Sequence, residues 1–266
     1  MGEADVPVEL SRLWRLGAES RLGRPAKLDV DRVVRAAVEL ADREGLGGVT
    51  LPKVAETLGV TKMSLYRHVG SKDELLVLMA DLASGPPPEI SAAAGRWRDG
   101  LREWSVALAA TLRRHSWLVR VPTSGPPSGP NHIAWMDAAL RVLRDSGLDW
   151  GEKVGVVSVV SGYVGSASRL ALDLEEGRRG SGLEQAQVER DYGRALAELV
   201  DPRRFPEAAA LFASGVFEPP PGPSDDEPVD HDFVFGLELI LDGVAVAVET
   251  AARQTGGGTT QPSGRL

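Results

Sequence analysis

Residues 50–69 constrain the fold most, because their residue types match a helix-turn-helix position by position. Thr50 is suited to cap a short helix, and Pro52 is tolerated in its first turn, where backbone N–H groups lack helical partners. Gly59 follows that helix and can take the left-handed conformation that ends it. Thr61 then caps a second helix of about nine residues, roughly 13 Å long at 1.5 Å per residue. The pattern predicts two short helices joined by a tight turn.

The second of these helices has a chemically distinct outward face. Leu65 and Val69 are predicted to point inward, and residues 59–72 contain no acidic residue. The outward side chains are Lys62, Met63, Ser64, Tyr66, Arg67 and His68. A helix of this size fits the major groove of DNA, where such groups bond to base edges and phosphates. We therefore expect this face to bind DNA; the alternative is a solvated helical hairpin with coincidental charges.

Helical periodicity extends over most of the chain. Apolar residues recur at spacings of three and four from Val30 to Ala41, with Asp29 placed as N-cap and Gly45 beyond the last turn. Further helices are predicted at residues 73–83, 97–112, 133–144, 150–174, 183–200 and 233–252. No run alternates as a strand does between hairpin turns. The sequence therefore predicts an all-α protein.

Stretches rich in Pro and Gly at 84–89, 122–130 and 218–228 suggest how the helices are grouped. We predict four regions: a basic N-terminal arm at 1–27, a three-helix helix-turn-helix domain at 28–83, a second helical domain at 89–254, and a disordered tail at 255–266.

Composition excludes several classes of protein. The 266 residues include no cysteine, which removes a disulfide framework, a thiolate nucleophile and a cysteine-rich zinc site. The N-terminus lacks the apolar core of a signal peptide. The Val-rich uncharged run 154–168 is shorter than the roughly 20 residues that span a bilayer. We expect a cytoplasmic protein without a membrane span, whose net charge of −8 confines any DNA contact to a locally basic face.

Residues 65–76, Leu-Tyr-Arg-His-Val-Gly-Ser-Lys-Asp-Glu-Leu-Leu, follow the helix-turn-helix and include a capping-box match, Ser71 with Glu74. Together they resemble the DNA-binding domain of the bacterial tetracycline-repressor (TetR) family, over about 28–82. The resemblance implies DNA contacts from Thr50, Lys53, Thr61, Lys62, Met63, Ser64, Tyr66, His68 and Lys72, with Arg67 on the same face. Pro52 stands where several relatives have a basic residue, so Lys53 is its substitute.

Residues 233–243, Phe-Val-Phe-Gly-Leu-Glu-Leu-Ile-Leu-Asp-Gly, resemble the last helix of TetR-type regulatory domains. That resemblance implies a homodimer, in which this helix and the one at 150–174 form a four-helix interface with their copies. The middle of 150–174 is apolar nearly all round, which requires burial on more than one side. A core helix buried within a monomer is the alternative.

The resemblance also implies a cavity for a small-molecule effector. Such cavities are mostly apolar with few polar groups. Candidate walls are Trp104, Trp117, Trp135, Met136, Tyr163 and Phe212, and candidate polar anchors are His115, His132 and Arg169; each of them can equally be ordinary core. No carboxylate lies at ligand spacing beside His132 or His231, so we expect no metal site and no cofactor.

Ahead of the first predicted helix, basic residues punctuate the chain at Arg12, Arg15, Arg21, Arg24 and Lys27. An extended basic arm can follow the DNA backbone or enter a minor groove. A partly helical leader that shields the domain is the alternative, and apolar residues at Leu10, Leu13, Trp14 and Leu16 suggest docking on protein.

The leading hypothesis is a homodimeric transcriptional repressor. Two recognition helices would enter successive major grooves of a palindromic operator, about 34 Å apart, until a small-molecule effector releases them. A DNA-binding scaffold controlled by a protein partner is a second possibility. Carboxylates at Glu175, Glu176 and residues 225–227 could suggest an enzyme, but no phosphate loop, nucleophile elbow or metal-spaced motif accompanies them, so we expect no catalysis.

Overall fold

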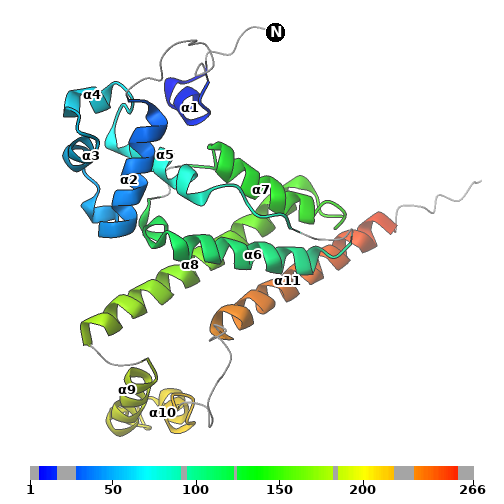
Figure 1. Cartoon of the computed structure of the whole chain (residues 1–266). Coiled ribbons are helices and arrows are strands. Elements are labelled where there is room, and N and C mark those ends of the chain that lie inside the picture. The colour runs from blue at the N-terminus through cyan, green and yellow to red at the C-terminus, as the bar shows by residue number, and fades with distance from the viewer. Residues whose placement is uncertain are drawn as a thin grey trace, which may run out of the picture. The chain divides into compact units, whose positions relative to one another are not determined.

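The computed structural model describes residues 6–16, 28–90, 95–122, 125–181, 185–218 and 231–256 (Figure 1). Within these ranges the chain forms helices, turns and connections and no β-strand, which confirms the all-α prediction. It divides into two compact units, one of Met1–Ser168 with Phe235–Leu266 and one of Arg169–Val234.

The helices are numbered in chain order. The N-terminal part contains α1 (Val8–Leu13), α2 (Val30–Glu44), the 3-10 turn η2 (Leu46–Gly48), α3 (Leu51–Leu58), α4 (Lys62–Tyr66) and α5 (Lys72–Ser84). It is followed by α6 (Trp97–Arg114), the 3-10 turn η3 (Ser116–Arg120), α7 (Pro130–Val142), α8 (Trp150–Ser181), α9 (Gln185–Leu199), α10 (Pro206–Ala213) and α11 (His231–Gly256). Helix α11 ends at Gly256, two residues after the predicted domain boundary at 254.

The caps of α2, α3 and α4 are as predicted. Asp29 accepts a hydrogen bond from the backbone N–H of Arg32, and α2 ends at Gly45 with φ of 71°. The hydroxyls of Thr50 and Thr61 accept the corresponding bonds at the starts of α3 and α4. Gly59 takes the left-handed conformation, at φ 65° and ψ 35°, where a side chain would be strained.

The second helix of the motif, α4, is shorter than the nine residues expected. It has five residues and ends at Tyr66. The N–H of His68 donates to the carbonyl of Leu65 at 2.8 Å, a three-residue spacing that tightens the last turn. Val69 is fully buried, so the chain turns inward there instead of continuing along the helix axis.

One apolar core joins the N-terminal helices. It contains Val33 and Val34 of α2, Val54 of α3, Leu65 of α4 and Met79 of α5, all fully buried. Leu13 of α1 and Trp117 of η3 complete this core, from outside the predicted three-helix domain. We call the part made by α1 to α5 the head.

Helices α6 and α11 are joined by ion pairs. Arg102 and Arg98 both donate to the carboxylate of Glu238, each at 2.6 Å. Arg98 also donates to Asp242, and Arg102 to Asp99. The bonds from Arg102 and then Arg98 lower the pKa of Glu238 to about 2.

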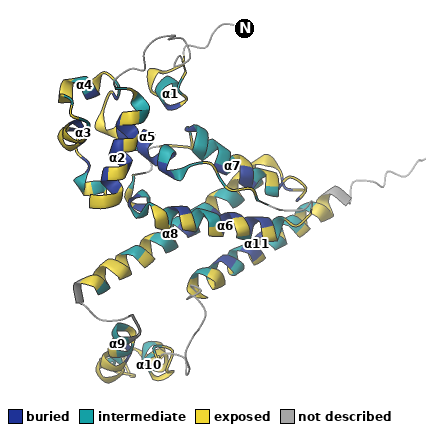
Figure 2. Ribbon diagram, viewed as in Figure 1, coloured by how far each residue is buried: buried dark blue, intermediate teal, exposed yellow. Residues whose placement is uncertain are grey.

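Helices α8 and α11 each bury one apolar stripe and expose another (Figure 2). The buried residues include Val160, Val164, Leu237 and Leu241, and the exposed ones include Val154, Val159, Phe235, Leu239 and Val246. Among the described residues, one helical stretch, Trp150–Arg179, passes the length and composition test for a membrane span, with mean hydropathy 1.2 in a window that is 17% buried. A helix that packs against a second chain has the same two-sided apolar surface.

The second unit contains a helical hairpin of α9 and α10. Its contacts are aromatic: Tyr192 lies edge-on to Phe212 and Phe217, and the two phenylalanines stack at 5.5 Å. Gly193 is buried against Phe217, where a Cβ would approach the ring to 2.7 Å. Helix α10 was not among the predicted helices, and Phe212, a candidate cavity wall, lies in it.

Candidate nucleic-acid interface

The residues predicted to contact DNA lie on four neighbouring pieces of the head. Thr50 and Lys53 are at the start of α3, and Thr61 caps α4. The α4 helix and the turn after it carry Lys62, Met63, Ser64, Tyr66, Arg67 and His68, and Lys72 begins α5. All are exposed except Ser64 and His68, which are half-buried and therefore less outward than expected.

The exposed face of α4 combines a cation, an apolar chain and an aromatic ring. Met63 is 71% exposed, an unusual position for a methionine that no contact within the head explains. The Lys62 ammonium lies 5.7 Å from the centre of the Tyr66 ring, which holds both side chains on one side of the helix. Leu65, on the opposite side, is fully buried. The core thus fixes which face of α4 is presented to solvent.

Lys53 is paired within the head. Its ammonium donates to the carboxylate of Glu44, the last residue of α2, at 2.7 Å. This bond lowers the pKa of Glu44, so the carboxylate stays ionised. Both side chains are about half exposed, and an exposed pair of this kind contributes little to stability. Lys53 can therefore exchange Glu44 for a phosphate at small energetic cost.

Two hydrogen bonds cap the N-terminus of α5, one at Ser71 and one at the preceding residue, Gly70. The N–H of Glu74 donates to the Ser71 hydroxyl at 3.0 Å, as the capping box predicts. The Glu74 carboxylate accepts from the N–H of Gly70 at 2.8 Å, one residue earlier than in the usual box. Lys72 is therefore held in the first turn of a fixed helix.

The N-terminal arm is not extended where it is described. Residues 8–13 form α1, Arg12 is paired with Glu74, and Arg15 is paired with Asp31 of α2 at 2.6 Å. Because two carboxylates of the head already hold these guanidinium groups, the docked-leader alternative describes this segment. Arg21, Arg24 and Lys27 lie outside the described residues.

Apart from Phe212 of α10, eight residues are candidates for effector binding, and four of them meet at one junction of helices. Trp104 and Trp135 are buried and meet edge-to-face at 5.9 Å. The indole of Trp104 donates to the carbonyl of Trp135, and the indole of Trp135 donates to the carbonyl of Gly85. His132 and Met136 lie on α7 with Trp135, and both are half-buried. These four residues form the junction of α5, α6 and α7.

The other four candidates lie elsewhere. His115 and the indole of Trp117 both contact the Asp42 carboxylate of α2, at 2.8 and 2.7 Å, so they attach η3 to the head. Tyr163 of α8 packs on Gly236 of α11, where a Cβ would lie 2.3 Å from its hydroxyl oxygen. Arg169 is exposed and belongs to the second unit. His115, Trp117 and Tyr163 thus take part in contacts between helices.

Comparison with known proteins identifies the arrangement. Residues 91–248 match the family described as "Tetracyclin repressor-like, C-terminal domain", and residues 33–79 match "Bacterial regulatory proteins, tetR family". The first match covers more than half of the chain. The chain belongs to the TetR family.

The relatives extend over nearly the whole chain. The HTH-type transcriptional repressor DrrR1 of Streptomyces coeruleorubidus is 37% identical over 250 residues, which are 93% of this chain and 88% of that protein. The class A tetracycline repressor from transposon 1721 of Escherichia coli is 31% identical over 223 residues, 82% and 91% of the two chains. ActR of Streptomyces coelicolor, solved in complex with actinorhodin, has a TM-score of 0.66 at 28% identity and covers 84% of this chain and 99% of its own. The protein is thus a DNA-binding transcriptional repressor of the TetR family.

The junction of this TetR-family chain contains one residue that the sequence did not single out. Asp81 of α5 is buried, and one of its carboxylate oxygens accepts hydrogen bonds from the backbone N–H groups of Asn131 and His132, both at 3.0 Å. Asp81 therefore caps the N-terminus of α7 from another helix, in place of Gly129, which has no side chain to do so. The sequence indicated this cap only indirectly, because α7 begins at Gly129-Pro130 and neither residue has a side chain that can cap a helix.

His132 completes this junction. Its Nε2 shares a 3.1 Å hydrogen bond with the Ser84 hydroxyl, and burial lowers the pKa of the imidazole while the Asp81 charge opposes that shift. His132, predicted as a ligand anchor, thus helps to fasten α7 to α5. Among the described residues, no three His, Asp or Glu side chains gather as a metal site would require.

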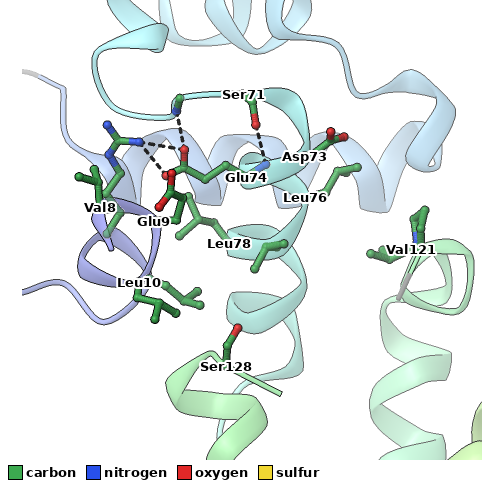
Figure 3. A pocket seen from close by; sticks show the side chains of 15 residues that line it. Val8, Glu9, Leu10, Ser71, Asp73, Glu74, Leu76, Leu78, Val121 and Ser128 are labelled. Atoms are coloured by element: carbon green, nitrogen blue, oxygen red, sulfur yellow. Dashed lines mark hydrogen bonds and ion pairs between the residues drawn. The ribbon is translucent and has the colours of Figure 1, made fainter. Parts of the chain in front are cut away.

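A cleft of about 840 Å³ lies between α1, α5 and the segment that leads to α7 (Figure 3). It is lined mainly by apolar side chains, among them Leu10, Leu76 and Val121, with the Arg12–Glu74 pair at one end. None of the effector candidates is among the described residues that line this cleft.

Proposed function

We propose that the protein is a homodimeric repressor that binds a palindromic operator and is released by a small organic effector. The observation that carries the proposal is the exposed apolar surface of α8 and α11, which lies on the same chain as the predicted DNA-binding face of α4. Phe235 on α11 is 68% exposed and Val159 on α8 is 58% exposed. A second copy would cover both, and a two-fold dimer matches a palindromic site.

The dimer is tested by sedimentation of the full-length protein in detergent-free buffer. Val159→Asp and Phe235→Asp are expected to convert a dimer into monomer, because each places a charge in a dry interface. Val106→Asp, at an exposed valine of α6, is the matched control and should leave the dimer intact. A wild-type monomer, or a protein that partitions into lipid vesicles instead, would overturn this part of the proposal.

The operator is tested by selecting bound sites from random duplex DNA. The wild type should enrich a palindrome whose half-sites are about 34 Å apart, one helical turn. Lys62→Ala should weaken binding to it by about 1–3 kcal/mol and relax one base position. The Tyr66→Ala variant should also lose the consensus. Enrichment of unpaired half-sites by the wild type would contradict the palindromic arrangement.

The effector part of the proposal is supported by the ActR complex with actinorhodin and by the tetracycline repressors among the relatives. A ligand releases DNA only if it binds the DNA-incompetent form more tightly, and DNA then weakens the ligand by the same factor. Actinorhodin and tetracycline are suitable probes, titrated into the protein alone and into its complex with the selected duplex. Equal affinity in both titrations for a probe that binds would show that its site is not coupled to DNA.

A further inference from the structure

The helix α1 is a structural part of the head although it precedes the residues that match the family. The family match begins at residue 33, whereas α1 spans Val8–Leu13. Leu13 is only 4% exposed and belongs to the same core as α2, α3 and α5. Leu10 packs against this core from the solvent side. The head is therefore a unit of α1 to α5, and α1 has a fixed position on it.

Arg12 places a guanidinium group at the turn between α4 and α5. One guanidinium nitrogen donates to both carboxylate oxygens of Glu74 at 2.8 Å, and dashed lines in Figure 3 converge on Glu74 from this pair and from the turn. The Glu74 side chain is only 10% exposed. A Cβ on Gly70 would lie 2.6 Å from Glu74 and 3.1 Å from Arg12, so the three groups are closely packed.

This carboxylate is placed where a negative charge opposes DNA binding. Glu74 lies in the first turn of α5, close to Lys72 and directly bonded to the turn that follows α4. Without a counter-charge, it would repel the phosphate backbone at every DNA sequence. Its bond to the Gly70 N–H nevertheless fixes the turn that precedes α5. Arg12 resolves this conflict, because it neutralises the charge and leaves the cap in place.

The other end of α1 contacts the segment that begins α7. The indole N–H of Trp14, directly after α1, donates to the carbonyl of Ser128 at 2.8 Å. The next residues, Gly129 to His132, are those held by Asp81 of α5. One short stretch therefore holds both α1 and α5, from a part of the chain that matches the regulatory domain.

We propose that α1 is a coupling helix, in which Trp14 follows the position of residues 128–132 and Arg12 sets the charge and order of the DNA-facing turn at Gly70 to Lys72. Arg12 is a positioning residue that acts through Glu74. A shift of residues 128–132 moves Trp14 with it. This movement withdraws Arg12 from Glu74 and exposes the Glu74 carboxylate to the DNA phosphates. The proposal rests on the DNA binding of the protein and on no particular operator or effector.

The charge part is tested with Arg12→Gln alone and combined with Glu74→Gln, which keeps an acceptor for the Gly70 N–H. On a random-sequence duplex, the single variant should bind about 5- to 10-fold more weakly, as for an uncompensated charge near a phosphate. The double variant should return to within about threefold of the wild type, because the carboxylate is gone. Arg141→Gln is the matched control, since it removes an ion-paired arginine of α7 that contacts neither α1 nor the turn. Failure of the second substitution to restore binding would overturn the charge argument.

The coupling part is tested by amide hydrogen exchange without DNA, so its result stands even if the protein fails to select a site. Trp14→Phe keeps a ring and removes the donor to Ser128. We expect the Gly70 amide to exchange faster in Trp14→Phe, as in Arg12→Gln, with the α2 core amides unchanged. If Trp14→Phe alters exchange only at 128–132 and binds the random duplex as the wild type does, α1 does not couple the two sites.

Discussion

Replacing Asp81 by Ala should be among the most destabilising single changes in this chain. The Asp81 side chain is 6% exposed and accepts from the backbone N–H groups of Asn131 and His132 and from the Asn131 side chain. Its removal leaves two backbone donors without this acceptor at a half-buried helix start. Each unsatisfied donor costs about 1–3 kcal/mol, so we expect the free energy of unfolding to fall by about 2–6 kcal/mol. Asp81→Asn, which keeps one acceptor, should lose less.

The assay is urea unfolding followed by circular dichroism at one fixed protein concentration, because the stability of a dimer depends on concentration. Asp137→Ala is the control: this aspartate lies within α7, its side chain is 63% exposed, and it is paired with Arg141 of the same helix. It should change stability by less than about 0.5 kcal/mol. An Asp81→Ala protein as stable as the Asp137→Ala protein would refute the assignment of Asp81 as the cap of α7.

Gly129→Ala provides an independent test of the same contact. A Cβ there would lie 2.1 Å from the Asp81 carboxylate oxygen, although the backbone at φ −82° accepts any residue. The substitution should therefore destabilise the wild type more than the Asp81→Ala background, where the carboxylate is absent and only the Cβ of residue 81, at 2.9 Å, remains close. Additive losses would mean that the two residues do not meet.

Three further predictions concern the surface charges. Lys72→Ala should weaken binding to all DNA sequences alike and reduce the slope of log affinity against log salt by about one; an unchanged slope would remove Lys72 from the interface. Glu44→Gln should strengthen binding to random duplex, measured at low salt, because Lys53 is no longer held back and a carboxylate near DNA is lost. Glu238 has a pKa lowered to about 2, so its stabilising contribution is complete above its ordinary pKa near 4.5 and is lost as pH falls toward 2. In this pH window we expect the free energy of unfolding to fall by about 1–2 kcal/mol more in the wild type than in Glu238→Gln. The difference is modest because solvent partly screens the ion pairs.

The features that the sequence predicted correctly depend on neighbours within one helical turn. Asp29, Thr50 and Thr61 cap helices through bonds to residues three positions ahead, and Gly59 ends α3 through its own backbone freedom. Such interactions are encoded within a few letters of sequence, so they can be recognised without knowledge of the fold. The length of α4 was wrong because its end is decided by the burial of Val69 in the core.

The features that it missed depend on residues far apart in the chain. Asp81 and Asn131 are separated by 50 positions, and Trp14 and Ser128 by 114. Aromatic residues such as Trp117 were predicted to be cavity walls. Helical periodicity predicts that such a side chain is buried, but it does not predict which residues bury it. Here the partner is Asp42 of the head.

The two long-range contacts meet on a single helix. Glu74 and Asp81 are seven residues apart on α5, about 10 Å along its axis at 1.5 Å per residue. Glu74 is held from the first turn by α1, and Asp81 is held near the last turn by α7. A rotation of the head about either contact alone would break the other, so α5 can move only if both change together. Residues 128–132 touch both α1 and Asp81. A displacement of this stretch is therefore the smallest change in the regulatory domain that can act on both ends of α5 at once.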